Sequence, residues 1–270
     1  MRRAKGKGAR ARRGGPFKYF DPMQNHVIWP GRERALRLFI QQPYGGMRHK
    51  SRNAHSSNSE DALTWSCFDT LAQVRAETRR QALTDIWELT FGNRTTPEGV
   101  LSGKIYVGKR YGAGESTEVD ASIEGPGAIV FIEAKLYSTM SAADRDKRKP
   151  HNQIERKLRV GLREAAGRDS TFYFILLDVA PFEALRSLRA GLSLAKALKP
   201  NATGFGGKWT TAYWFARYKY GSRGSLAPLQ RLVGDAGFPE TRAKDVAERL
   251  GWLTWADVFK SVLRSVIPAS

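Results

Sequence analysis

Residues 117–138 read TEVDASIEGPGAIVFIEAKLYS, and this stretch decides the fold. Apolar side chains dominate both of its halves, and the Gly-Pro-Gly sequence between them is a strong turn signal. The stretch therefore predicts a β-hairpin, with strands at 116–123 and 128–136 joined by a four-residue turn at 124–127. Four charged side chains interrupt the apolar pattern: Glu118, Asp120, Glu133 and Lys135.

The strand at 128–136 is apolar on both faces until it reaches Glu133, which predicts a central place in a sheet. Side chains alternate between the two faces of a strand, so Glu133 and Lys135 share one face. An ionised carboxylate in such a place is costly unless a cation lies beside it. A four-residue turn sets Glu118 opposite Glu133 with Asp120 diagonal to it, and a register shift of one or two residues lets either acid meet Glu133.

Two or three carboxylates in a cluster repel one another unless a cation lies among them. Mg²⁺, for which Mn²⁺ can substitute, suits such a cluster because it takes carboxylate oxygens together with water. A neighbouring lysine adds positive charge for a phosphate, and these groups together are typical of metal-assisted phosphodiester hydrolysis. The alternative is a structural ion pair between Glu133 and Lys135.

Asp120, followed 13 positions later by Glu133-Ala134-Lys135, resembles the catalytic signature of the PD-(D/E)XK, restriction-endonuclease-like nucleases. The resemblance covers residues 57–178. It implies that Asp120, Glu133 and the backbone carbonyl of Ala134 hold the metal. It also implies that Lys135 orients or activates the attacking water.

The same family often adds a glutamate from its first core helix, and Glu60 fits that place as a catalytic residue and metal ligand. An alternative role for Glu60 is a capping box at the start of its helix. Gln153, which opens the helix after the motif, resembles an accessory residue of some branches, and Glu118 is a second accessory candidate. Val119 stands where the nominal motif has proline.

The predicted elements follow the order of an α/β fold. Apolar periodicity predicts helices at 60–74, 76–89 and 152–166, and strands at 102–108 and 171–177 join the hairpin. The order helix–strand–strand–strand–helix–strand matches the core of the family named above. The resemblance therefore implies a restriction-endonuclease-like mixed sheet flanked by helices, with a helical C-terminal extension.

Three regions are expected along the chain: a basic tail at 1–15, a nuclease-like core with an N-terminal extension at 16–180, and a mostly helical extension packed on the core at 181–270. Within the last region, helical patterns at 241–250 and 255–266 flank Gly251. This arrangement leaves a helix-turn-helix-like DNA-binding regulator open as an alternative function.

The net charge is +19, from 45 Lys and Arg against 26 Asp and Glu, and it favours a polyanionic partner. We expect nucleic acid, with DNA favoured over RNA, gripped through its phosphates. Two polar loops, at 41–59 and 141–150, carry the candidate contacts. These are Arg48, Lys50, Arg52, Arg145, Lys147, Arg148 and Lys149. A catalytically inactive nucleic-acid-binding module on the same fold is a further alternative.

Cys67 is the single cysteine, which excludes an internal disulfide and a cysteine-based zinc site and fits a cytoplasmic location. No apolar run reaches the ~18 residues that span a membrane. The basic start of the chain has no apolar segment after it, so we expect neither a secretory signal nor a membrane partner. The formation of a homodimer stays open.

Overall fold

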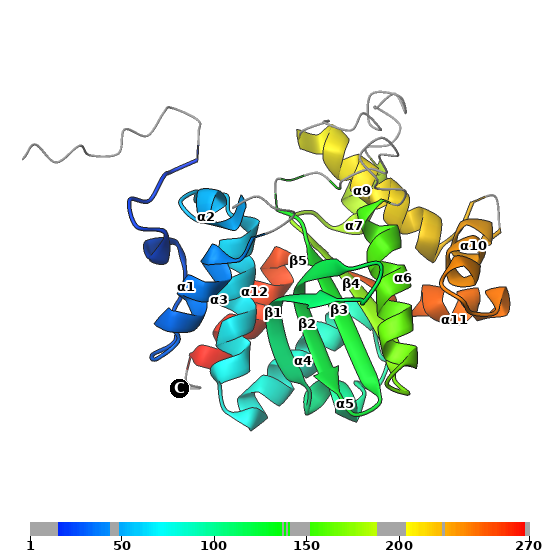
Figure 1. Cartoon of the computed structure of the whole chain (residues 1–270), viewed down its shortest axis with the longest axis horizontal. Coiled ribbons are helices and arrows are strands. Elements are labelled where there is room, and N and C mark those ends of the chain that lie inside the picture. The colour runs from blue at the N-terminus through cyan, green and yellow to red at the C-terminus, as the bar shows by residue number, and fades with distance from the viewer. Residues whose placement is uncertain are drawn as a thin grey trace, which may run out of the picture.

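The computed structural model describes residues 16–43, 49–136, 138, 140, 152–187, 204–222 and 225–267. Its centre is a five-stranded open sheet with helices on both faces (Figure 1). The predicted basic tail and five of the predicted nucleic-acid contacts lie outside the described residues. Those five are Arg48, Arg145, Lys147, Arg148 and Lys149.

The sheet has the strand order β1-β2-β3-β4-β5 and is mixed. The first three strands are antiparallel neighbours, whereas β3, β4 and β5 run parallel to one another. The predicted α/β class with a mixed sheet is therefore confirmed. The strands are β1 (Lys104–Tyr111), β2 (Thr117–Gly125), β3 (Ala128–Ala134), β4 (Thr171–Asp178) and β5 (Leu250–Thr254).

The hairpin between β2 and β3 closes with a shorter turn than the sequence predicts. Gly125 pairs with Ala128, so only Pro126 and Gly127 form the turn. Gly127 has φ +69°, a left-handed conformation that glycine adopts without strain. The predicted four-residue turn is wrong, and the shorter turn moves the register between the strands by two residues. Helix α5 (Glu98–Leu101) packs on both strands near this turn.

One face of the sheet is covered by α6 (Gln153–Ala166), and α9 (Gly204–Lys219) and α10 (Ala227–Asp235) pack beside it. Ile129 and Phe131 of β3 belong to the apolar cluster on this side, together with residues of all three helices. The helix predicted at 152–166 is therefore confirmed as α6, one residue later at its start.

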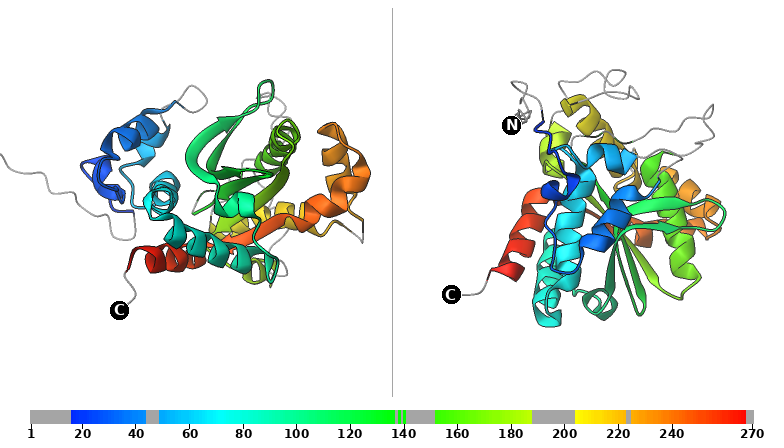
Figure 2. Two further views of the ribbon diagram at one scale, coloured as in Figure 1. Left: turned by 90° about the horizontal axis from the view of Figure 1, so that it is seen from below. Right: turned by 60° about the vertical axis from the view of Figure 1, so that its left-hand side comes forward.

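The other face is covered by α3 (Glu60–Gln73), α4 (Ala76–Phe91) and α12 (Trp255–Val266) (Figure 2). Val130 and Ile132 alternate with the residues of the first face and are buried in this second apolar cluster. β3 is thus buried on both faces, as its doubly apolar sequence predicts, and it is the middle strand of the five.

The N-terminal extension forms a small helical unit beside α3. It comprises the 3₁₀ helix η1 (Pro22–Asn25), α1 (Glu33–Gln41) and α2 (His49–Asn53). Its apolar cluster gathers Leu36, Phe39 and Ile40 against Trp65 of α3. The loop predicted at 41–59 therefore contains a short helix, and the Ala54 N–H donates to the Lys50 carbonyl at 2.8 Å.

The C-terminal extension contributes a strand to the sheet as well as helices. The helix predicted at 241–250 ends at Glu248, and Gly251 lies in β5 opposite Ile175. A Cβ at Gly251 would lie 2.1 Å from Cγ2 of Thr90, so α4 packs closely on this strand. The helix-turn-helix geometry is therefore wrong. The shorter helices here are α7 (Phe182–Ser187), η3 (Glu240–Arg242) and α11 (Ala243–Glu248).

Candidate active site

The hydrogen-bonded ladder between β2 and β3 stops just before two acids. Its last pair is Ala121 opposite Ile132. Beyond that pair the Asp120 carboxylate replaces a backbone acceptor, because its Oδ2 accepts the Ala134 N–H at 2.8 Å. The same register places Asp120 opposite Glu133, which is fully buried at 0% exposure. The two acids therefore meet at this end of the strand pair.

Glu118, which the four-residue turn would place opposite Glu133, lies elsewhere. It forms an ion pair with Lys50 of α2, and both side chains are almost completely buried. The prediction that Lys50 contacts nucleic acid is therefore wrong, because this lysine is 4% exposed and ties the N-terminal extension to β2. Arg52, two residues further along α2, is exposed and stays a predicted contact.

Two lysines surround the acid pair. Lys135 Nζ lies 2.8 Å from Glu133 Oε1 and 3.4 Å from Glu60 Oε1. Lys157 Nζ forms an ion pair with Glu133 Oε2 and lies 3.9 Å from Asp120 Oδ2. We call Asp120, Glu133, Lys135 and Lys157 the acid-pair cluster. It brings together three of the four catalytic residues predicted from the sequence and adds one that was not predicted.

Lys157 was missed although the sequence carries a signal for it. The predicted apolar face of α6 includes Ile154 and Gly161, and Lys157 lies three residues after the first and four before the second. Such spacing places all three on one face of a helix. Lys157 lies on the core face of α6 and is 1% exposed, so its charge needs a buried acid as partner.

The two acids of the cluster differ in proton affinity. Burial, together with the nearby charge of Glu133, raises the pKa of Asp120 well above its usual value. Burial also acts to raise the pKa of Glu133, but the charges of Lys135 and Lys157 outweigh it and lower that pKa to about 2. Asp120 therefore has the higher proton affinity of the two acids, and the lysines favour the charged form of Glu133.

Glu60 reaches the segment after β3 and not the acid pair itself. Its Oε2 accepts the Leu136 N–H at 2.6 Å and the Ser138 hydroxyl at 2.7 Å, while Oε1 faces Lys135. Ser59 is the N-cap of α3, so the alternative capping box for Glu60 is wrong. In this arrangement Glu60 positions Lys135 and the backbone that follows it.

The candidate metal donors are few. Across the described ranges, no group of three or more His, Cys, Asp or Glu side chains is arranged to hold a metal ion. The acid pair offers two carboxylates, and Mg²⁺ in proteins is often held by one or two carboxylates plus water and substrate phosphate. Glu133 Oε1 is buried without a hydrogen-bond partner, because Lys135 lies at ion-pair distance but outside hydrogen-bond geometry. This oxygen already has the Lys135 ammonium as its ion-pair partner, so a divalent cation would have to share it with that lysine.

Gln153 lies near Lys157 along α6, and Trp255 bonds to the segment that carries Lys135. Gln153 opens α6, as predicted, and lies one helical turn before Lys157 on the same side of the helix. The indole N–H of Trp255, the first residue of α12, donates to the Lys135 carbonyl at 3.2 Å. The C-terminal extension therefore helps to hold the segment that carries Lys135.

Comparisons with known proteins add no family to this geometry. No family model matches the chain, and neither the curated proteins nor the solved structures give a match. In the part of the chain that the structure describes, no helix combines the length and the apolar character needed to cross a membrane. The residues of the site and the charge of the chain are therefore the features that point to a function.

Proposed function

We propose that this protein is a Mg²⁺-dependent nuclease that hydrolyses phosphodiester bonds of nucleic acid, with DNA as the favoured substrate. The observation that carries the proposal is the meeting of Asp120 and Glu133 beside Lys135 where β2 and β3 end. Acids and a lysine at this spacing on a hairpin resemble the PD-(D/E)XK signature, and ionisable groups with strongly perturbed pKa values are common at functional sites.

The order of elements is compatible with a restriction-endonuclease-like fold, which we propose for residues 60–178. After α3, and after α4 and α5 that follow it, come the three antiparallel strands, then α6 and the parallel strand β4. β5 and α12 are additions from the C-terminal extension. They complete the sheet beyond β4 and cover part of one face.

Three residues of the cluster, together with Ala134 and Glu60 beside it, have proposed roles. Asp120, Glu133 and the Ala134 carbonyl would hold Mg²⁺. When bound, the ion would neutralise charge on the phosphate and lower the pKa of water. Lys135 would orient the attacking water and neutralise charge that builds on the phosphate. Glu60 would hold Lys135 in place, because its carboxylate also fixes the backbone that follows this lysine.

A second candidate function is supported by a specific observation. Lys135 and Lys157 already provide two positive charges beside Asp120 and Glu133, so the cluster is electrically balanced without a metal ion. The alternative is therefore an inactive nucleic-acid-binding module whose acid pair serves only stability. The net charge of +19 suits either function, because phosphate binding is driven by Lys and Arg.

Cleavage assays distinguish these two functions. Plasmid DNA, single-stranded DNA and RNA would each be incubated with the protein in Mg²⁺ and in EDTA. We expect products only in Mg²⁺, and we expect Asp120→Asn and Glu133→Gln to lower the rate by at least about a hundredfold. Glu124→Gln, a change of the same kind on the same strand as Asp120, is the matched control and should cleave at the wild-type rate.

Retention of binding separates a catalytic loss from misfolding. Glu133→Gln should still bind DNA in EDTA as tightly as the wild type, since the phosphate contacts lie outside the acid pair. Wild-type protein that binds DNA but never cleaves it in Mg²⁺ or Mn²⁺ would establish the binding module instead. Equal cleavage by wild type and Glu133→Gln would leave the acid pair without a catalytic role.

A further inference from the structure

A groove runs between the N-terminal helical unit and the outer edge of the sheet. Six consecutive residues of β1, at 104–109, line one wall, and residues of α1 and α3 line the other. Figure 2 shows the N-terminal helices beside β1, which is the edge strand of the sheet. The cavity measures about 530 Å³, within the ~300–1,000 Å³ of small-ligand sites. We call it the β1 groove.

The β1 groove is rich in positive charge. Four cationic side chains line it, against a single acidic one. The acid, Asp69, is already engaged by Arg32 at 2.6 Å, so it adds no free negative charge. Of the other three cations, Lys109 forms an ion pair with Glu124, whereas Arg79 and the solvent-exposed Lys104 have no acidic partner among the described residues.

Two buried donors of the β1 groove have no partner. Trp65 is 3% exposed, and its indole Nε1 has no hydrogen-bond partner. The Nε of Arg79 is buried and equally unpaired, although its Nη1 lies 3.4 Å from the Ala72 carbonyl. Buried donors are nearly always satisfied in folded proteins. Two unpaired donors in one cationic groove therefore point to a ligand that presents acceptor oxygens.

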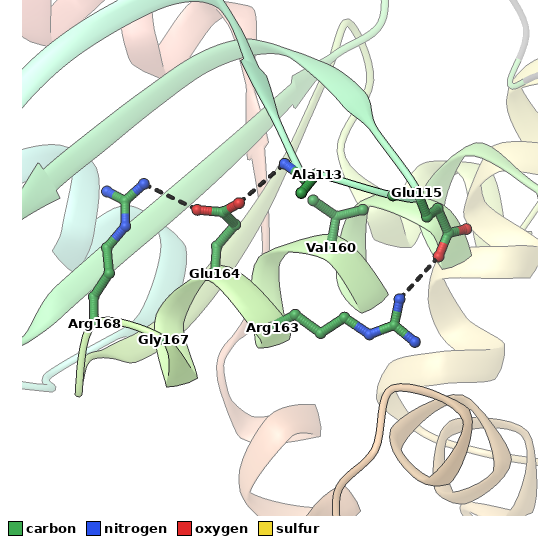
Figure 3. A pocket seen from close by; sticks show the side chains of 9 residues that line it. Ala113, Glu115, Val160, Arg163, Glu164, Gly167 and Arg168 are labelled. Atoms are coloured by element: carbon green, nitrogen blue, oxygen red, sulfur yellow. Dashed lines mark hydrogen bonds and ion pairs between the residues drawn. The ribbon is translucent and has the colours of Figure 1, made fainter.

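A second cavity provides a contrast. It lies between the β1–β2 connection and α6, with a volume of about 410 Å³ (Figure 3). Its charged side chains already bind one another: Arg168 lies 2.9 Å from Glu164, Glu164 accepts the Gly112 N–H at 2.9 Å, and Arg163 pairs with Glu115. This cavity is neutralised internally, whereas the β1 groove keeps unpaired donors.

We infer that the β1 groove binds a single-stranded segment of nucleic acid, and this inference rests on the proposed nuclease function. Phosphate oxygens satisfy N–H donors and cations alike, whereas a peptide would bring as many donors as acceptors. A cavity of this size holds an unpaired nucleotide, whereas a duplex presents only its outer backbone to such a groove. Tyr106, flanked by Lys104 and Lys109, adds an aromatic ring at the rim.

The β1 groove also leads toward the acid pair. A neighbouring cavity of about 400 Å³ shares Gln42, Gly108 and Lys109 with it and extends to Arg110 and Glu118. Glu118 precedes Asp120 by two positions on β2. A strand held along β1 would therefore run past the beginning of β2 toward the proposed site of cleavage.

Binding in EDTA tests the inference without cleavage. The affinity of a labelled, mixed-sequence single-stranded DNA would be measured by fluorescence anisotropy over a range of salt concentrations. Lys104→Glu reverses an exposed charge, and Trp65→Phe removes the indole N–H but keeps an aromatic ring. We expect Lys104→Glu to weaken binding by about tenfold and to reduce the salt slope by about 0.7 for each phosphate that the variant no longer neutralises.

The control is Lys244→Glu, the same charge reversal on α11 beside the opposite edge of the sheet. It should bind single-stranded DNA as the wild type does, and Trp65→Phe should bind it more weakly. The inference is overturned if Lys104→Glu and Trp65→Phe bind normally, or if Lys244→Glu is as weak as Lys104→Glu. The same measurement would be made with the matching duplex. Weak binding of the duplex by Lys104→Glu, with normal binding of the single strand, would also contradict the inference.

The nuclease proposal and the β1 groove proposal can be contradicted independently of each other. Loss of cleavage in Glu133→Gln with normal binding by Lys104→Glu would keep the nuclease and remove the β1 groove as its strand-binding site. Normal cleavage by Glu133→Gln with weak binding by Lys104→Glu would remove the nuclease site and keep the β1 groove as a binding site for nucleic acid. Lys104 is exposed, so its variant is expected to fold.

Discussion

Two charged clusters share strand β2, and they are satisfied to very different degrees. At one of them, Glu124 Oε1 accepts hydrogen bonds from Lys109 and the Tyr111 hydroxyl, and Oε2 accepts one from Arg168 at 2.6 Å. Burial would raise the pKa of Glu124, but these three donors outweigh it and lower that pKa. This Glu124 cluster has the character of a structural network.

The acid-pair cluster is more deeply buried and less completely bonded. Glu133 Oε1 has no hydrogen-bond partner, and Asp120 has a raised pKa beside the charged Glu133. Buried polar networks stabilise a fold when every member is satisfied and cost stability when one is not. The Glu124 cluster is thus bonded as a structural network is, whereas the acid-pair cluster is left with the incomplete bonding that the proposed catalytic role requires.

The largest difference between the two clusters should appear in the rate of cleavage when one cation is removed from each. Lys135→Met should lower Mg²⁺-dependent cleavage by about 10²–10⁴-fold, because it removes the group proposed to orient water and to neutralise the phosphate. Arg168→Met should leave the rate unchanged, since Arg168 pairs with Glu124 and Glu164, away from the acid pair. Cleavage rates on one DNA substrate check both changes, and equal rates for the two variants would erase the proposed distinction.

Lys157→Met should have the largest effect on stability. It leaves Glu133 buried without its closest partner, which costs about 3–5 kcal/mol in the free energy of unfolding. Urea denaturation at neutral pH measures this loss. Added Mg²⁺ should restore more stability to the variant than to the wild type, because the ion takes over the missing charge. A variant as stable as the wild type would show that Lys157 does not neutralise the pair.

Glu124→Gln should destabilise the protein by a smaller amount, about 1–3 kcal/mol, because it weakens three hydrogen bonds that involve charged groups. Cleavage should be unaffected while the protein is folded. Thermal unfolding together with the cleavage assay checks both expectations. A strong loss of activity with little loss of stability would place Glu124 in the catalytic machinery instead.

A last prediction concerns the pH dependence of stability and Asp61, which follows Glu60 on α3. Burial raises the pKa of Asp61 to about 6, although Lys50 opposes this shift. An acid whose folded pKa lies above its unfolded value stabilises the fold at low pH, and that stability is lost as pH rises from about 4 to about 6. The melting temperature of Asp61→Asn should therefore fall less over this interval than that of the wild type. Parallel curves would contradict the shift.

Local patterns were enough to predict most of the sheet. The hairpin, the middle strand of the sheet and the helix α6 can be predicted from alternation and helical periodicity, because these patterns depend on near neighbours in the chain. The register between β2 and β3 could not be predicted in this way, because adding or removing a residue in the turn shifts one strand relative to the other. β5 was predicted as part of a helical region, because the five residues around Gly251 carry no apolar alternation. These residues form a strand because they pair with β4 and pack on α4.

The acids of the candidate site could be predicted from the sequence, but not all of their partners could. Asp120, Glu133 and Lys135 are close in sequence and lie on one hairpin, so strand geometry brings them together. Lys157 comes from a helix that reaches the sheet only through the tertiary fold. The sequence marks it as a buried cation on the core face of α6, but it does not say which acid it meets.

The binding of a divalent ion tests the central claim most directly. Isothermal titration calorimetry with Mn²⁺ or Mg²⁺ would compare the wild type with Asp120→Asn/Glu133→Gln, and Glu124→Gln would serve as the control. We predict saturable binding by the wild type and by Glu124→Gln, and its loss in the double variant. Identical heats from the wild type and the double variant would contradict the claim that the acid pair is a metal site.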